Sequence, residues 1–325
     1  MKTLFQKPFL RALLLASLLG PCAVWAGVTD HYWQDVAQRS LPADAPQPAQ
    51  FRALALDNQK MTDYLRQAHS NGAAVEVSLP LPEGDFSDFT VVDSGTLPTQ
   101  LQQKYPDILS FQGRDAEGRR VRLDVSPLGF QAMVFDPEGI WVVRPQSVAT
   151  GTDQYLSYRR AELDVPGMQW QCETHGEVSD IDKALRGPAQ PKTVTGTNKR
   201  VYRAAVAANH HYIGAVGNGT VAGGLAATTV AINRVNELYE HEMSIRFQLV
   251  PNNDLIMYAN AGSDPFASNG TGVISNSTSV INAAIGVGNY DIGHVFTTGS
   301  GGVAGLRVVC SNSSKARGTT GLPDP

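Results

Sequence analysis

The chain has 325 residues, of which 42% are hydrophobic and 17% charged, and its formal net charge is −4. This length and composition fit about two globular domains, each large enough to bury a core of its own. The slightly negative charge provides no basic surface for nucleic acid or for an anionic membrane, so neither is expected as a partner.

The first 26 residues have the pattern of a signal peptide. Lys2, Lys7 and Arg11 form a positive start, an apolar run follows, and Val24 and Ala26 are small residues at the −3 and −1 positions. The apolar run is too short to span a bilayer, and no later segment resembles a transmembrane helix. We expect cleavage near Ala26 and a secreted protein, extracellular or periplasmic.

Cleavage would remove Cys22 and leave two cysteines, Cys172 and Cys310. Two cysteines do not make a disulfide scaffold. They could bridge one another, or each could have a separate partner or bind a metal.

Residues 27–184 are predicted to form an α+β domain that is mainly antiparallel β. Short runs of Val, Phe and Ile alternate with polar residues and are separated by turn sequences such as DAEGRR and DPEG. Helices are expected near residues 58–69 and 98–105. Residues 185–198 are rich in Pro, Gly and Thr and are predicted to be a linker between domains.

From residue 199 to 325 the pattern changes to alternating strands and helices. Strands are expected in RVYRAAVAAN, SIRFQLVPN and DIGHVFTT, and helices in residues 220–242 and 272–286. This order predicts a mixed, mostly parallel sheet with right-handed crossovers, and VAGLRVVC would add an edge strand.

Residue types alone do not assign a catalytic or metal site. HEMSI, residues 241–245, begins like the zinc helix HExxH but has Ile245 in place of the second histidine. His210 and His211 are expected on a strand, pointing to opposite faces. Gly217, Asn218, Gly219 and Ala222 give GxGxxA, but no acidic residue ends the next strand, so a tight turn is favoured over a nucleotide site.

Several long segments match one family in order. They are VYRAAVAANHHY, AATTVAINRVNELYEHE, SIRFQLV, YDIGHVFTTGSGGVAGLRVVC and KARGTTG, and FRALALD and KYPDILSFQG resemble the family's prodomain. Residues 199–321 resemble the N-terminal half of the catalytic domain of reprolysin-like (adamalysin-like) zinc metallopeptidases, which are metzincins; the secreted bacterial members are the most similar. The resemblance implies a zinc metalloendopeptidase made as a zymogen.

The family's zinc motif, HExxHxxGxxH, follows shortly after the region that KARGTTG resembles. The given sequence ends at Pro325 without it. We therefore expect a truncated, N-terminal part of such an enzyme, inactive as given. Zinc is the cofactor expected for the complete enzyme, and no catalytic or metal-binding residue can be assigned here.

The resemblance also implies roles for a few residues. Peptidases of this kind hold protein or peptide substrate as an added strand, which points to Gly305, Leu306, Arg307 and Val308 as an edge strand that binds it. The alternative is an ordinary strand after a glycine loop. His294, among apolar residues, is expected to be a core histidine.

The family also suggests roles for the two cysteines. Cys310 would pair with a cysteine further along the chain. Cys172 is a candidate zymogen switch, since a thiolate can occupy the zinc position until activation. A second hypothesis is a non-catalytic secreted binding protein that retains the metzincin sheet edge.

Overall fold

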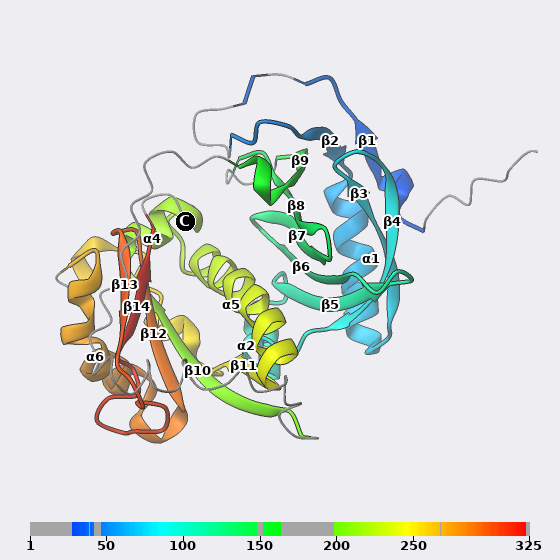
Figure 1. Cartoon of the computed structure of the whole chain (residues 1–325). Helices are drawn as coiled ribbons and strands as arrows, with labels where there is room; N and C mark the ends of the chain where they lie inside the picture. The colour runs from blue at the N-terminus through cyan, green and yellow to red at the C-terminus, as the bar shows by residue number, and fades with distance from the viewer. Residues whose placement is uncertain are drawn as a thin grey trace, which may run out of the picture.

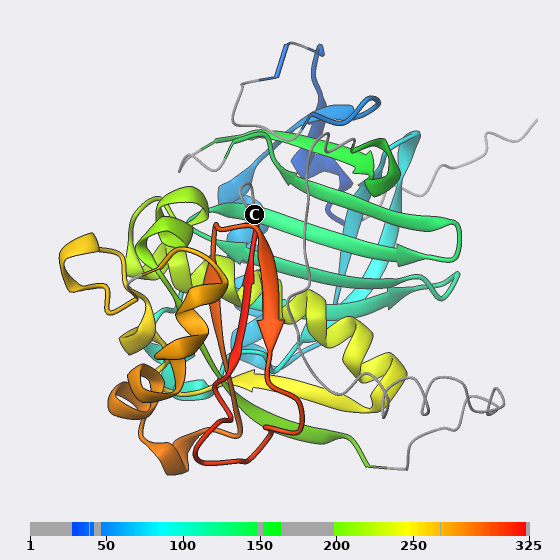
Figure 2. The same ribbon diagram turned by 60° about the vertical axis from the view of Figure 1, so that its left-hand side comes forward.

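The computed structural model describes residues 28–38, 40–41, 47–147, 152–163, 198–266 and 268–322. The predicted signal peptide, Cys172 and all but the last residue of the predicted linker lie outside the described residues. Two β-sheets lie on either side of one long helix, α5 (Val221–Met243) (Figures 1 and 2).

The first sheet has nine strands, all antiparallel, in the order β1-β2-β9-β8-β7-β6-β5-β4-β3. The strands are β1 (Trp33–Asp35), β2 (Arg52–Leu56), β3 (Val75–Leu81), β4 (Gly84–Asp93), β5 (Leu109–Asp115), β6 (Arg120–Ser126), β7 (Gly129–Asp136), β8 (Gly139–Pro145) and β9 (Gln154–Arg159). The sheet curls until its end strands β1 and β3 come together, and Trp33 of β1 donates from Nε1 to the carbonyl oxygen of Ser78 in β3 (3.2 Å).

Buried residues alternate with more exposed ones along these strands, so the two faces of the sheet differ. In β7, Phe130, Ala132 and Val134 are buried, and they join an apolar core that includes Trp141 and Phe111. Helix α1 (Asn58–Asn71) adds residues such as Met61 and Leu65 to this core; its N-cap, Asp57, accepts from the amide of Lys60 (3.1 Å). A second helix, α2 (Thr99–Lys104), connects β4 to β5. The predicted antiparallel sheet and both predicted helices are confirmed.

The second sheet has five strands in the order β11-β10-β12-β14-β13. They are β10 (Arg200–Ala208), β11 (Ile245–Leu249), β12 (Ile292–Thr297), β13 (Gly301–Ala304) and β14 (Gly318–Gly321). All pairs are parallel except β13 with β14, which confirms the predicted mixed, mostly parallel sheet. Helix α6 (Ser277–Ile285) contacts β12 and β10.

Helix α5 is buried on more than one side because it lies between the two sheets (Figure 1). Leu225, Ala226 and Ile232 belong to the apolar core of the second sheet. Asn233 and Glu237 of the same helix are buried against strands of the first sheet. The helix begins after the N-cap Thr220 and ends at Ser244, whose φ of 55° is left-handed.

The two parts also share apolar contacts. Leu97, Leu101, Ile108 and Leu128, all from the first part of the chain, are in the core cluster formed mainly by residues 204–316. The contact between the parts is therefore partly apolar, around α2, and partly polar, along α5. The domain boundaries stay a prediction.

One expected strand ends earlier than predicted. His210 and His211 were expected on a strand, but they begin the short helix α4 (His210–Val216), whose N-cap Asn209 accepts from the amide of Tyr212 (3.0 Å). The expectation of opposite faces is wrong: their rings stack at 3.9 Å between centroids.

The glycine pattern that follows α4 lies between two helices rather than between a strand and a helix. A Cβ on Gly217 would come within 2.5 Å of the amide nitrogen of Gly224, so the glycines allow α4 and α5 to pack closely. Among the described residues no single helix is both long and apolar enough to cross a membrane; α4 and α5 pass that test only as a pair bent by 82°.

Candidate functional site

The end of the second sheet is the candidate peptide-binding edge. In the strand order of the described residues β13 comes last, and it is the only antiparallel strand of its sheet. Its residues pair with β14 from Gly301–Gly321 to Ala304–Gly318. An end strand can take up an extended peptide through main-chain hydrogen bonds.

The residues chosen from the sequence for that strand are misplaced by a few positions. Gly305, Leu306, Arg307 and Val308 are not in a strand; they follow β13 in a turn. Arg307 has a φ of 59° and Cys310 one of 62°, and this left-handed backbone interrupts an extended chain. The ladder to β14 extends by a single hydrogen bond, from Gly305 N to Arg317 O (2.8 Å). The edge strand is therefore Gly301–Ala304, and substrate binding at residues 305–308 stays a prediction.

A buried lysine fixes the segment between β13 and β14. Lys315 is 3% exposed, and its Nζ donates to the carbonyl oxygens of Tyr290 (2.7 Å) and Val287 and to Oδ1 of Asn312 (3.1 Å). Its ammonium also lies over the Tyr290 ring, 4.3 Å from the centroid. Carbonyl dipoles and the aromatic face replace water around this charge, so Lys315 has a structural role.

His294 lies in β12 beside the same strands. Its Nε2 is 3.0 Å from Oγ1 of Thr320 in β14, and burial lowers its pKa to about 4. The imidazole is therefore neutral at pH 7 and bonded to a hydroxyl. The side chain is half-buried, so His294 lies at the border of the core rather than deep within it.

The described residues do not fit a zinc site. No three His, Cys, Asp or Glu side chains in this part of the chain lie close enough together to hold a metal ion. His210 Nδ1 is 2.7 Å from Oδ2 of Asp264, but a third ligand is lacking. His241 is exposed in the last turn of α5. We therefore derive no chemical step through zinc from these residues.

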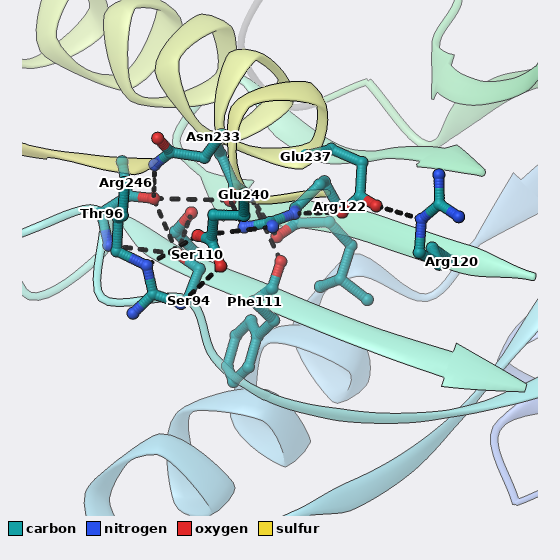
Figure 3. A network of polar contacts seen from close by, with 12 residues as sticks. Ser94, Thr96, Ser110, Phe111, Arg120, Arg122, Asn233, Glu237, Glu240 and Arg246 are labelled. Atoms are coloured by element: carbon teal, nitrogen blue, oxygen red, sulfur yellow. Dashed lines mark hydrogen bonds and ion pairs between the residues drawn. The ribbon is translucent and has the colours of Figure 1, made fainter. Parts of the chain in front are cut away.

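The most extensive polar arrangement of the described residues lies between α5 and the first sheet (Figure 3). Arg122 of β6, 3% exposed, donates from Nε to Glu237 (2.7 Å), and Arg120 also donates to Glu237. One turn later, Glu240 accepts from Nε of Arg246 (2.6 Å) and pairs with Lys199. The pairs of Glu237 with Arg120 and Arg122 hold α5 on the polar face of the first sheet, whereas Arg246 of β11 and Lys199 link Glu240 to the second sheet.

A buried carboxyl belongs to the same network. Asp124, 2% exposed, accepts from Ser110 Oγ (2.6 Å) and from Asn233 Nδ2 (3.2 Å). Burial raises its pKa to about 6, although these hydrogen bonds oppose the rise. This network could not be identified from the sequence, because its members are spread over β5, β6 and α5 with no common spacing.

Of Cys172 and Cys310, the structure describes only Cys310. Cys310 is exposed and free, and its amide donates to the carbonyl oxygen of Asp291 (2.8 Å). Its expected pairing with a cysteine further along the chain stays a prediction. Cys172, the candidate zymogen switch, lies outside the described residues.

The family comparison bears on the second sheet. Residues 225–324 match the family model described as Metallo-peptidase family M12B Reprolysin-like. The match begins within α5 and includes β11, α6, β12, β13 and β14. No curated protein matches the chain. The reprolysin-like resemblance inferred from the sequence is confirmed for this segment, and it supports a metallopeptidase of a zinc-dependent family in general terms.

Proposed function

We propose that residues 198–322 form the peptide-binding part of a secreted zinc metalloendopeptidase. An extended protein or peptide substrate would lie along β13, and its main chain would extend the five-stranded sheet. The zinc ligands and the general base would come from sequence outside the described residues, after the reprolysin-like segment.

One observation carries the proposal: the reprolysin-like segment ends in a parallel sheet whose last strand, β13, is short and antiparallel. Strand addition takes its affinity from main-chain hydrogen bonds and its selectivity from side chains along the groove. In this proposal residues 27–184, which include the nine-stranded sheet, are an inhibitory prodomain, and Cys172 is its zinc-directed thiolate.

Peptide binding is tested by hydrogen exchange on the full chain. An extended peptide from a casein digest should slow amide exchange within residues 301–304. The same peptide with alternate N-methylated amides is the matched control, because it presents the same side chains without the donors. Protection confined to other segments would contradict the assignment of β13.

Catalysis is tested separately. The 325-residue chain should hold substoichiometric zinc by elemental analysis and should not hydrolyse casein in a chelator-sensitive way, since three protein ligands and an open position are needed. Tightly bound zinc together with chelator-sensitive hydrolysis would show that residues outside the described set complete a site within this chain.

The lack of a metal-ligand group in the described residues also favours a second candidate, a non-catalytic secreted binding protein with the same sheet edge. The coding sequence beyond codon 325 separates the two. An HExxHxxGxxH motif within about 40 codons, read in any of the three frames, supports the peptidase. A stop codon followed by unrelated sequence supports the binding protein.

A further inference from the structure

A second feature between the two sheets is a small pocket with two arginines. Its volume is about 150 Å³, and its walls include Arg144 of β8, Arg234 of α5, Gln131, Tyr212 and Val230. One water molecule takes about 30 Å³ of the liquid, so the pocket has room for a few waters or one small polyatomic ion.

The two guanidinium groups lack acidic partners among the described residues. Nε of Arg144 is buried and makes no hydrogen bond. Arg234 donates from Nη2 to Oε1 of Gln131 (3.1 Å), a neutral acceptor. Neither arginine has an ion pair in the described part of the chain, whereas Arg122, on the same face of the first sheet, has one with Glu237.

Their surroundings make these charges unfavourable. Burial lowers the pKa of Arg234, and the positive charge of Arg144 lowers it further. The opposing negative charge is that of Asp124, whose oxygens are already bonded to Ser110 and Asn233 and which also interacts with Arg122. Two cations in one small pocket therefore share a single carboxyl.

We propose that this pocket is a binding site for a small oxyanion, phosphate or a carboxylate, held between Arg144 and Arg234. Guanidinium groups present planar, paired donors that match the oxygens of both anions. Arg144 comes from the first sheet and Arg234 from α5, so the bound anion joins the two parts of the molecule.

Thermal unfolding of the full chain tests the site. Inorganic phosphate and sodium acetate are each added at constant ionic strength, with sodium chloride as reference, since salt alone screens repulsion. An anion that binds the folded state raises Tm, and at 100 times Kd we expect a rise of at least about 2 °C. A rise with phosphate alone identifies a phosphate ligand, and a rise with acetate alone identifies a carboxylate.

The variants Arg144→Gln and Arg234→Gln should lose the anion-dependent rise in Tm. Without added anion, each should unfold at the same temperature as the unmodified chain or higher, because removing one charge relieves repulsion. A purely structural arginine would instead lower Tm when replaced. Arg114→Gln, which removes an exposed charge of β5, is the control and should keep the full anion response.

Arg144→Lys provides a second measurement if a glutamine variant does not fold. It keeps the charge but not the paired donors, so the anion response should weaken at least threefold in Kd without being lost. The proposal is overturned if neither anion raises Tm more than chloride does. It is equally overturned if the response persists in both folded glutamine variants.

Discussion

At the scale of single residues, a network of buried charged and polar side chains lies between α5 and the first sheet. Asp124 shows why this network could not be found from the sequence. In the sequence RRVRLDVSP it alternates with apolar residues as a solvent-facing strand residue would. Its burial comes from Asn233 and Ser110, which lie 109 and 14 positions away in the chain. Tertiary packing alone determines its environment.

Asp124 should make stability fall as the pH rises from about 4 to 6. The pKa of its carboxyl is about 6 in the folded state, against 3.8 for the unperturbed group, so the folded chain holds this proton over a pH range where the unfolded chain has released it. The loss of stability caused by the buried Asp124 carboxylate is absent below pH 4, grows between pH 4 and 6 and is complete above pH 6. A rise of this size corresponds to about 3 kcal/mol.

The measurement compares urea unfolding of the unmodified chain with that of Asp124→Asn at several pH values. Their difference in unfolding free energy should change by about 3 kcal/mol between pH 4 and 6 and stay level above. A difference is needed because His294, with its lowered pKa, makes stability fall in the opposite direction, as the pH decreases from 6.5 to 4. Asp88→Asn, at an exposed position, should give a level difference throughout. A level difference for Asp124→Asn would contradict the raised pKa.

At the scale of elements, the spacing of apolar residues predicted the helices and strands that have a clear apolar pattern. Helix α5 and strands β10, β11 and β12 were found because Val, Ile and Leu recur at the spacing of each structure. The edge strand was predicted at residues 305–308, but it lies at Gly301–Ala304, and β14 was not predicted. GTTG has no apolar alternation, and in GLRVVC the two valines favour a strand while the left-handed backbone at Arg307 and Cys310 prevents one. Neither that backbone nor the contacts of Lys315, which lies between β13 and β14, can be read from sequence patterns.

Close backbone packing at this edge requires glycine, and Gly321 gives a test. A Cβ there would overlap the carbonyl oxygen of Gly299 and Oγ1 of Thr297. Gly321→Ala should therefore lower the free energy of unfolding by about 1–3 kcal/mol and speed amide exchange within residues 301–304. Gly288→Ala is the control, since its Cβ would meet nothing within 4 Å, and it should have little effect. Unchanged exchange in Gly321→Ala would mean that the edge adapts without strain.

At the scale of the whole molecule, the sequence predicted two parts but not how they meet. The resemblance to reprolysin-like enzymes suggested a prodomain acting near the zinc site. In the structure, α5 and the core cluster around Leu101 form the described contact with the first sheet. The contact combines an apolar patch with the Arg122–Glu237 pair. In the sequence, its apolar members, such as Leu97 and Ile108, cannot be told apart from core residues of the first part.

This contact predicts that the two parts stay together after the linker is cut. Trypsin should cut first at Arg186 or Lys192, in the linker predicted for residues 185–198, or directly after it at Lys199–Arg200. The nicked pieces should co-elute in size-exclusion chromatography at micromolar concentration, because the apolar patch and the buried ion pair remain. First cuts within residues 75–145, or separation of the unmodified pieces, would contradict the prediction.

The ion pair makes the test specific. Glu237→Gln removes the closer of the two carboxylates that pair with Arg122, which is 3% exposed. The remaining one, Glu240, lies 3.5 Å from Nη2 of Arg122. Removing one member of a buried charge pair between two bodies costs about 2–5 kcal/mol. Because Glu240 still pairs with Arg122, we expect the lower end of this range, so the nicked pieces should associate about 30-fold more weakly. Glu242→Gln changes an exposed glutamate on the same helix and should leave their association unchanged. If both variants co-elute equally well over a dilution series, the apolar patch alone holds the two parts together.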